Sequence, residues 1–218
     1  MKNNFKSSAG MFAIAGTLSM IIGAVLWGST GTDLWATLAT NDMKNYLTKL
    51  PEAKTFLVLN TCFWVLGVLL MGVAIQLMSK LSRENIIPAT LARVVVNAAV
   101  PVAIVSFVLM VSLAITISSD NIQNSLLFAT NIGWIGARLD DIATLSIIGF
   151  APLFLSISGH NIWIPAWLRV WGFFAGLMGL LAIYGILVPD AYFLSFTILP
   201  VGLGWMIASG VVLIKSKD

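Results

Sequence analysis

Six long apolar runs determine what this chain can fold into. Each run is about as long as the 17–25 residues that a helix needs to cross a hydrocarbon core roughly 30 Å thick. A bilayer offers no water to backbone N–H and C=O groups, so a spanning segment must pair them internally, as a helix does. We therefore predict an all-α polytopic membrane protein with a single six-helix transmembrane domain over residues 1–218. The predicted spans are Ala9–Trp27, Thr55–Met78, Leu91–Ile117, Ile142–Ser158, Trp167–Val188 and Ala191–Ile214.

The positions of lysine and arginine predict the orientation of the spans, because short loops rich in these residues tend to remain in the cytoplasm. Both termini are predicted to be cytoplasmic, since this arrangement places most of the 12 lysines and arginines on the inner face. The inner cations are Lys2, Lys6, Lys80, Arg83, Arg93, Arg169, Lys215 and Lys217, and the outer ones are Lys44, Lys49, Lys54 and Arg138. The net charge of +3 is thus a signal of topology, and we predict no nucleic-acid partner.

Two residue types that often carry chemistry occur once each, as Cys62 and His160. A single cysteine excludes a disulfide within the chain and a Cys-rich metal site, and a single histidine cannot supply two axial ligands to a haem. The sequence also lacks HExxH, GxSxG and a glycine loop that could cradle phosphate. We therefore predict no cofactor and no metal, and we favour a non-enzymatic role.

Two outer connections carry patterns of their own. Within the connection Gly28–Lys54, the stretch NDMKNYLTKL has four apolar residues at i, i+3, i+4 and i+7, which form one helical stripe. We predict that this segment is a short amphipathic helix lying in the outer membrane interface. In Ser118–Ala137 the apolar residues come late, so we predict that the fourth span continues outward as a half-buried helix. The residues of the stripe are Met43, Tyr46, Leu47 and Leu50.

Tryptophan prefers the headgroup level of a bilayer because its ring is amphipathic. Trp27 and Trp35 flank the outer end of the first span and are predicted to mark that interface. Three tryptophans lie deeper, and we predict that they serve packing more than ligand stacking. They are Trp64, Trp171 and Trp205.

Gly172 and Gly176 in the fifth span have the GxxxG spacing that lets helix backbones approach closely. Two uses fit this motif. One is packing inside the bundle, which we favour, and the other is contact with a partner subunit or the seam of a homodimer.

The stretch GARLDDIATLSIIGF at the outer start of the fourth span places three charges beside an apolar run. Arg138 and Asp141 share a helix face, so they are predicted to pair, while Asp140 projects almost oppositely. Small residues beside Asp140 suggest that it faces other helices, and the bulkier face that follows Asp141 suits lipid or a wider contact. We expect Lys54 or Asn60, at a similar depth in the second span, to be the partner of Asp140.

Two interpretations of these charges remain open. In the first, they mark the end of a helix near the headgroups, where the helix dipole stabilises carboxylates. In the second, Asp140 binds a cation or carries a proton, because ionisable residues inside a membrane are costly and tend to be functional.

A second polar set lies near the inner ends of the spans and consists of Gln76, Arg93, Asn97 and His160. Arg93 and Asn97 are one turn apart on the same helix face, and the planar fork of arginine suits phosphate. We predict an anionic headgroup or a phosphate as the ligand, with snorkelling of Arg93 to the surface as the alternative. Together the candidate ligand-binding residues are Asp140, Arg93, Asn97, Gln76, Asn60, Arg138 and Asp141.

Three features form a recognisable pattern. They are the order of the spans, the arginine that opens the third span, and the stretch GHNIWIPAWLRVWGFFAGLMGLL before and within the fifth span. The pattern resembles a group of small bacterial six-span integral membrane proteins catalogued only as a domain of unknown function. The resemblance extends from Ala9 to Ile214 and has one motif, IPAWLRVWG. It implies a multi-pass protein of the bacterial inner membrane, and it transfers no substrate and no site residue.

Three functional hypotheses follow from these residues. The first is a non-enzymatic protein that binds a lipid, a small hydrophobic ligand or a partner membrane subunit. The second is a small secondary transporter in which Asp140 couples movement to protons or cations, although transporter sites usually lie near mid-membrane. The third is an intramembrane lipid-modifying enzyme, which needs converging catalytic groups, whereas Asp140 and His160 are predicted at opposite sides.

Overall fold

The computed structural model describes residues 2–82, 86–116 and 122–216. Within these ranges, six helices are long and apolar enough to cross a membrane, which confirms the all-α class and the predicted number of spans. Arg83, Ile117 and Lys217, on which parts of the predictions rest, lie outside the described residues, as does the start of the connection Ser118–Ala137. The elements are α1 (Lys2–Gly28), α2 (Leu34–Thr40), α3 (Met43–Leu81), α4 (Ile86–Thr116), α5 (Ile122–Leu145), η2 (Ser146–Phe150), α6 (Ala151–Ser158), α7 (Ala166–Leu187), η3 (Pro189–Thr197) and α8 (Ile198–Lys215).

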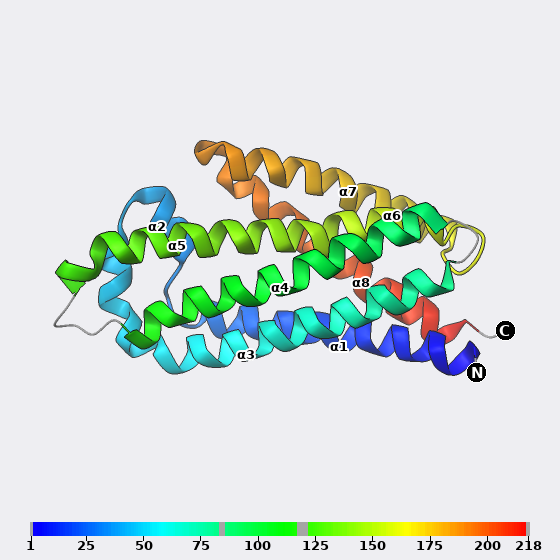
Figure 1. Ribbon diagram of the computed structural model, residues 1–218, viewed down its shortest axis with the longest axis horizontal. Coiled ribbons are helices and arrows are strands. Elements are labelled where there is room, and N and C mark those ends of the chain that lie inside the picture. Colours follow the sequence, from blue (N-terminus) through cyan, green and yellow to red (C-terminus); the bar gives the residue numbers. More distant parts are fainter. Residues whose placement is uncertain (1, 83–85, 117–121, 217–218) are drawn as a thin grey trace.

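Both ends of the chain lie at the same end of the bundle, beside the end of α3, the start of α4 and the α6–α7 connection (Figure 1). α2 lies at the opposite end, where α3, α4 and α5 extend past the point at which α7 stops (Figure 1). We name these the termini end and the cap end. An even number of spans requires this arrangement, and the side of the membrane that each end faces stays a prediction.

α1 packs mainly against α3 and α8. Gly16 of α1 and Gly67 of α3 meet backbone to backbone, so a Cβ added to either would lie 3.0 Å from the carbonyl oxygen of the other. Ser19 adds a hydrogen bond across the same pair of helices, from its Oγ to the Phe63 carbonyl at 2.7 Å. Because lipid is as apolar as leucine, such close contacts and interhelical hydrogen bonds hold membrane helices together.

The fourth span is the centre of the bundle. α5, η2 and α6 follow one another without a break, and the apolar window of this span is 56% buried, against 33–39% for the other five. The face that follows Asp141 is therefore buried as well, with Leu145, Ile148 and Leu155 at most 6% exposed. Of the two surroundings expected for this face, the wider helix contact is right and lipid is wrong.

η2 is a π-helical turn that separates α5 from α6 and was not predicted. It begins one turn after Asp141 and ends just before Pro152, which has no N–H to donate to the carbonyl four residues earlier. Single π turns inside α-helices occur frequently at functional sites.

The cap end has a hydrophobic core of its own. α3 has 39 residues, which at 1.5 Å per residue is about 58 Å and well beyond the thickness of a hydrocarbon core. Its first turns carry the predicted stripe, which is buried against residues of α2, α4 and α5. We call this cluster the cap; its buried residues are Leu34, Trp35, Leu38, Met43, Tyr46, Leu47, Leu50, Ala53, Leu57, Leu113, Ala114, Ala129 and Ala137.

The cap corrects one prediction and confirms another. The segment with the stripe is helical, but it continues through Pro51 into α3 and is not a separate helix in the interface. Its apolar face packs on protein because α2 and the start of α5 cover it. The outward continuation of the fourth span is confirmed, since α5 begins at Ile122.

Gly172 and Gly176 of α7 both face α6 of the same chain. A Cβ at Gly172 would lie 1.8 Å from the Ser156 Oγ, and one at Gly176 would lie 2.8 Å from a carbon of Leu153. Packing inside the bundle, the favoured interpretation of the motif, is thus what these two glycines do.

Candidate functional site

A cavity lies between the spans, toward the cap end, with about 770 Å³ of empty space when the space open to its surroundings is counted. All six spans contribute to its lining, together with α2 and η3. Its walls are mainly apolar, and the polar groups come chiefly from α5. The lining residues are Met20, Ala24, Trp27, Trp35, Trp64, Phe107, Asp140, Asp141, Thr144, Leu145, Ala182, Ile186, Ser195, Phe196, Ile198, Leu199 and Leu203.

Asp141 is held by a cation. Its Oδ2 accepts a hydrogen bond from Arg138 Nη1 at 3.1 Å, which confirms the predicted pair. The Asp141 side chain is 9% exposed and that of Arg138 28% exposed, so the cation reaches toward the surface. The Arg138 guanidinium lies 5.0 Å from the centre of the Trp134 ring.

Asp140 lines the same cavity but has a different environment. Thr144, one turn further along α5, is its hydrogen-bond donor, at a long 3.5 Å. Among the described residues we find no lysine or arginine within ion-pair distance of its carboxylate. Asp140 is therefore the acidic group of the cavity that is open to a ligand.

The expected partners of Asp140 were wrong. Asn60 is buried and donates its Nδ2 hydrogen to the Gly23 carbonyl of α1 at 2.9 Å, and Lys54 is exposed. Both residues were chosen by depth alone. Depth does not specify the direction in which a side chain points around its helix axis, and α3 turns Asn60 toward α1.

Aromatic rings from four helices form a continuous wall of the cavity, which we call the aromatic wall. Trp35 and Trp27 have ring centres 5.7 Å apart, Trp27 and Trp64 6.3 Å, and Trp64 and Phe107 5.2 Å. The Trp64 indole also donates to the Met20 carbonyl at 3.3 Å. Packing was expected for Trp64, and it lines the cavity as well.

Trp35 does not anchor the headgroup level as predicted, since it is only 7% exposed. The chain reverses after α1 at Gly31, whose φ of +64° favours glycine, and Asp33 caps α2 by accepting from the Ala36 N–H at 3.0 Å. This turn folds Trp35 back onto Trp27. The sequence signal that could have revealed it is the run of turn and cap residues between the two tryptophans.

A second, smaller cavity of about 350 Å³ shares all four rings of the aromatic wall with the first. It extends into the cap and is lined there by Tyr46, Leu34 and Leu57, with Asn60 and Thr61 of α3 at its side. The wall therefore stands between two cavities. Asn60, a predicted site residue, belongs to the second one.

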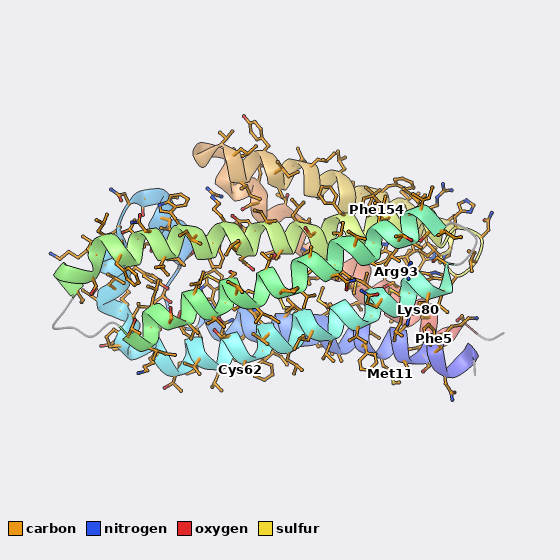
Figure 2. The ribbon with its side chains drawn as sticks, in the orientation of Figure 1. Phe5, Met11, Cys62, Lys80, Arg93 and Phe154 are labelled. Carbon is orange, nitrogen blue, oxygen red and sulfur yellow. The ribbon has the colours of Figure 1, made fainter. Side chains whose placement is uncertain are left out.

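The predicted inner polar set is not one site. Gln76 Nε2 donates to Asn97 Oδ1 and joins α3 to α4. Arg93, which lies on α4 toward the termini end (Figure 2), donates from Nη2 to Thr90 Oγ1 at 3.1 Å. His160 lines a separate cavity with Arg169 of α7.

Two further observations limit the chemistry of the site. In residues 2–82, 86–116 and 122–216, no three His, Cys, Asp or Glu side chains are grouped so as to hold a metal ion. His160 follows Asp140 along one helical span, about 30 Å further on at 1.5 Å per residue. These two groups therefore cannot act together, and the arrangement at Asp140 is suited to binding.

Comparisons with protein-family models, with curated proteins and with solved structures give no match. The function therefore has to be inferred from the residues of the chain itself.

Proposed function

We propose that this protein binds a small hydrophobic ligand with a cationic end in the cavity between its spans. The composition of the lining carries the proposal, because it combines two carboxylates, Asp140 and Asp141, with the rings of the aromatic wall. Small-molecule sites are likewise mostly apolar, with a few polar groups that orient the ligand.

The charges support a cation at one end of the ligand. Arg138 is engaged by Asp141 at 3.1 Å, which leaves the Asp140 carboxylate as the group that can pair with a ligand. Aromatic faces attract cations within about 6 Å of the ring centre, most strongly when water is excluded. An amine or phosphonium group would therefore find both a carboxylate and tryptophan rings in one cavity.

Tetraphenylphosphonium is a suitable probe, and triphenylphosphine oxide is its uncharged counterpart. The experiment is calorimetric titration of the full chain in lipid nanodiscs. We expect the cation to bind with measurable heat and the neutral compound to bind about tenfold more weakly or not at all, since a cation over aromatic faces in a site without water contributes about 2 kcal/mol or more.

The substitution Asp140→Asn keeps the shape of the side chain and removes the charge. It should weaken tetraphenylphosphonium binding about tenfold or more. Glu52→Gln is the matched control, because Glu52 is an exposed carboxylate outside the cavity. Equal affinity of Asp140→Asn and the unmodified protein, or equal binding of the two probes, would refute a cationic ligand.

A secondary transporter is the second candidate, and a specific observation favours it. The cavity reaches Asp140, and the π turn η2 interrupts the same helix one turn beyond the carboxylates. Single π turns inside α-helices occur frequently at functional sites, and transporter sites lie on irregular helices. In proteoliposomes, a pH gradient should then drive uptake of tetraphenylphosphonium, and Asp140→Asn should abolish the gradient dependence. Binding of tetraphenylphosphonium without any gradient-driven uptake would be consistent with a binding protein and would refute the transporter.

Other parts of the expected function keep their status as predictions. These are the binding of a lipid or a partner subunit, a place in the bacterial inner membrane and the cytoplasmic position of both termini.

A further inference from the structure

A second site lies at the termini end, where the chain passes from α6 to α7. Trp163 anchors this connection: its indole donates to the Ser82 Oγ at 3.0 Å, and the side chain is buried. The Gly159 carbonyl accepts the N–H groups of residues 162, 163 and 164 at 3.1–3.2 Å. The connection is therefore a fixed turn, and it holds His160 in one place.

A cavity of about 490 Å³ lies between this turn and the start of α7. His160 and Asn161 line one side, and Arg169 and Phe173 of α7 line the other. The Arg169 guanidinium stacks over the Phe173 ring at 5.5 Å. None of the described residues that line this cavity is acidic, so its charge is positive.

Arg169 has donor capacity that the described protein groups do not use. Its Nε is buried and has no hydrogen-bond partner among the described residues. Leaving a buried donor of a charged group unpaired costs free energy, which a bound acceptor would recover. The first N–H groups of α7 also lack helical partners and lie at the positive end of the helix dipole.

The surface next to the cavity is apolar. Trp167 is 54% exposed and Val170 68% exposed on the same stretch of α7, and Phe174 and Leu177 continue this face. A ligand held by Arg169 would thus have its remaining length against a surface suited to acyl chains.

We propose that this cavity binds the phosphate of an anionic phospholipid headgroup, with Arg169 and His160 as its main contacts. The planar fork of Arg169 matches two phosphate oxygens, while the exposed face of α7 holds the acyl chain. This site differs in place and in charge from the cavity at Asp140.

The test measures lipid affinity of the full chain by native mass spectrometry in detergent, with phosphatidylglycerol and phosphatidylcholine as probes. We expect phosphatidylglycerol to bind more tightly than phosphatidylcholine. Arg169→Gln should weaken the binding of phosphatidylglycerol about tenfold and remove the preference for it over phosphatidylcholine. His160→Gln should weaken the binding of phosphatidylglycerol less than Arg169→Gln does. Lys80→Gln is the control, because Lys80 is an exposed cation of α3 near the same end (Figure 2) and does not line the cavity.

Three results would overturn the proposal. The first is an equal loss in Lys80→Gln and Arg169→Gln, which would indicate general attraction by positive charge. The second is unchanged preference in both Arg169→Gln and His160→Gln. The third is full competition by inorganic phosphate at the same concentration as the lipid, which would indicate a site for free phosphate. Thermal unfolding of each variant without added lipid separates loss of binding from loss of fold.

Discussion

The ion pair between Arg138 and Asp141 offers a direct test of the site's electrostatics. The change Arg138→Gln removes the cation and leaves the Asp141 carboxylate, 9% exposed, without its partner at 3.1 Å. Two charges about 4 Å apart attract by about 4 kcal/mol at an effective dielectric constant of 20. Because Arg138 is 28% exposed, solvent screens part of this attraction, and we expect about 2 kcal/mol from the lost pair.

A second contribution comes from the contact between the Arg138 guanidinium and the Trp134 ring at 5.0 Å. An exposed contact of this kind contributes about 0.5–1 kcal/mol. Arg138→Gln should therefore lower the free energy of unfolding by about 2–3 kcal/mol. The double variant Arg138→Gln/Asp141→Asn should lower it by only about 1 kcal/mol, because it leaves no unpaired carboxylate and loses mainly the ring contact.

The assay is reversible unfolding of the full chain in mixed micelles with increasing denaturing detergent. Lys54→Gln is the control, since Lys54 is an exposed cation of α3 with no part in the cavity. Arg138→Gln should also raise the affinity for tetraphenylphosphonium severalfold, because both carboxylates then face the ligand. The reasoning fails if Arg138→Gln is as stable as Lys54→Gln, or if the double variant is no more stable than Arg138→Gln.

Three further predictions concern the fold. Leu47→Ala in the cap, where the side chain is fully buried, should lower the free energy of unfolding by about 2–5 kcal/mol in the same assay. Leu59→Ala on the exposed face of α3 should lower it much less, and equal losses would mean that the cap is not packed. Gly172→Val should destabilise by about 1–3 kcal/mol or more, because its Cβ would meet Ser156 Oγ, and a neutral result would contradict that helix contact. In a cysteine-free background, an impermeant thiol reagent should label Lys49→Cys in intact cells and label Lys215→Cys only after permeabilisation, and the reverse pattern would invert the predicted orientation.

The features that could be predicted from the sequence are those set by spacing along one helix. The length of the apolar runs gave the six spans, and the three-residue spacing of Arg138 and Asp141 gave their ion pair, which the structure confirms. The stripe at Met43, Tyr46 and Leu47 was likewise one face of a helix, although its surroundings were misassigned. Spacing specifies which residues share a face and not what that face contacts.

The direction of each face was harder to predict for a physical reason. In a soluble protein an apolar face points to the core, but in a membrane the lipid is as apolar as the core, so hydrophobicity no longer distinguishes them. The face after Asp141 was for this reason assigned partly to lipid, although Leu155 on that face is fully buried. Polar residues retain more information about which face of a helix is buried, and Asn60 is buried. Its acceptor, however, is a backbone carbonyl of α1, which no pattern of side chains could identify.

The aromatic wall brings these points together. Its rings come from α2, α1, α3 and α4, and each helix contributes one ring at a position that looks like an interface anchor or a packing residue when taken alone. They meet because the turn at Gly31 returns Trp35 toward Trp27 and because Gly16 and Gly67 let α1 and α3 approach closely enough for Trp27 to contact Trp64. A larger side chain at Gly16 or Gly67 would push α1 and α3 apart. It would therefore separate the rings without itself lining the cavity. The affinity for a hydrophobic cation thus depends on helix packing as well as on Asp140.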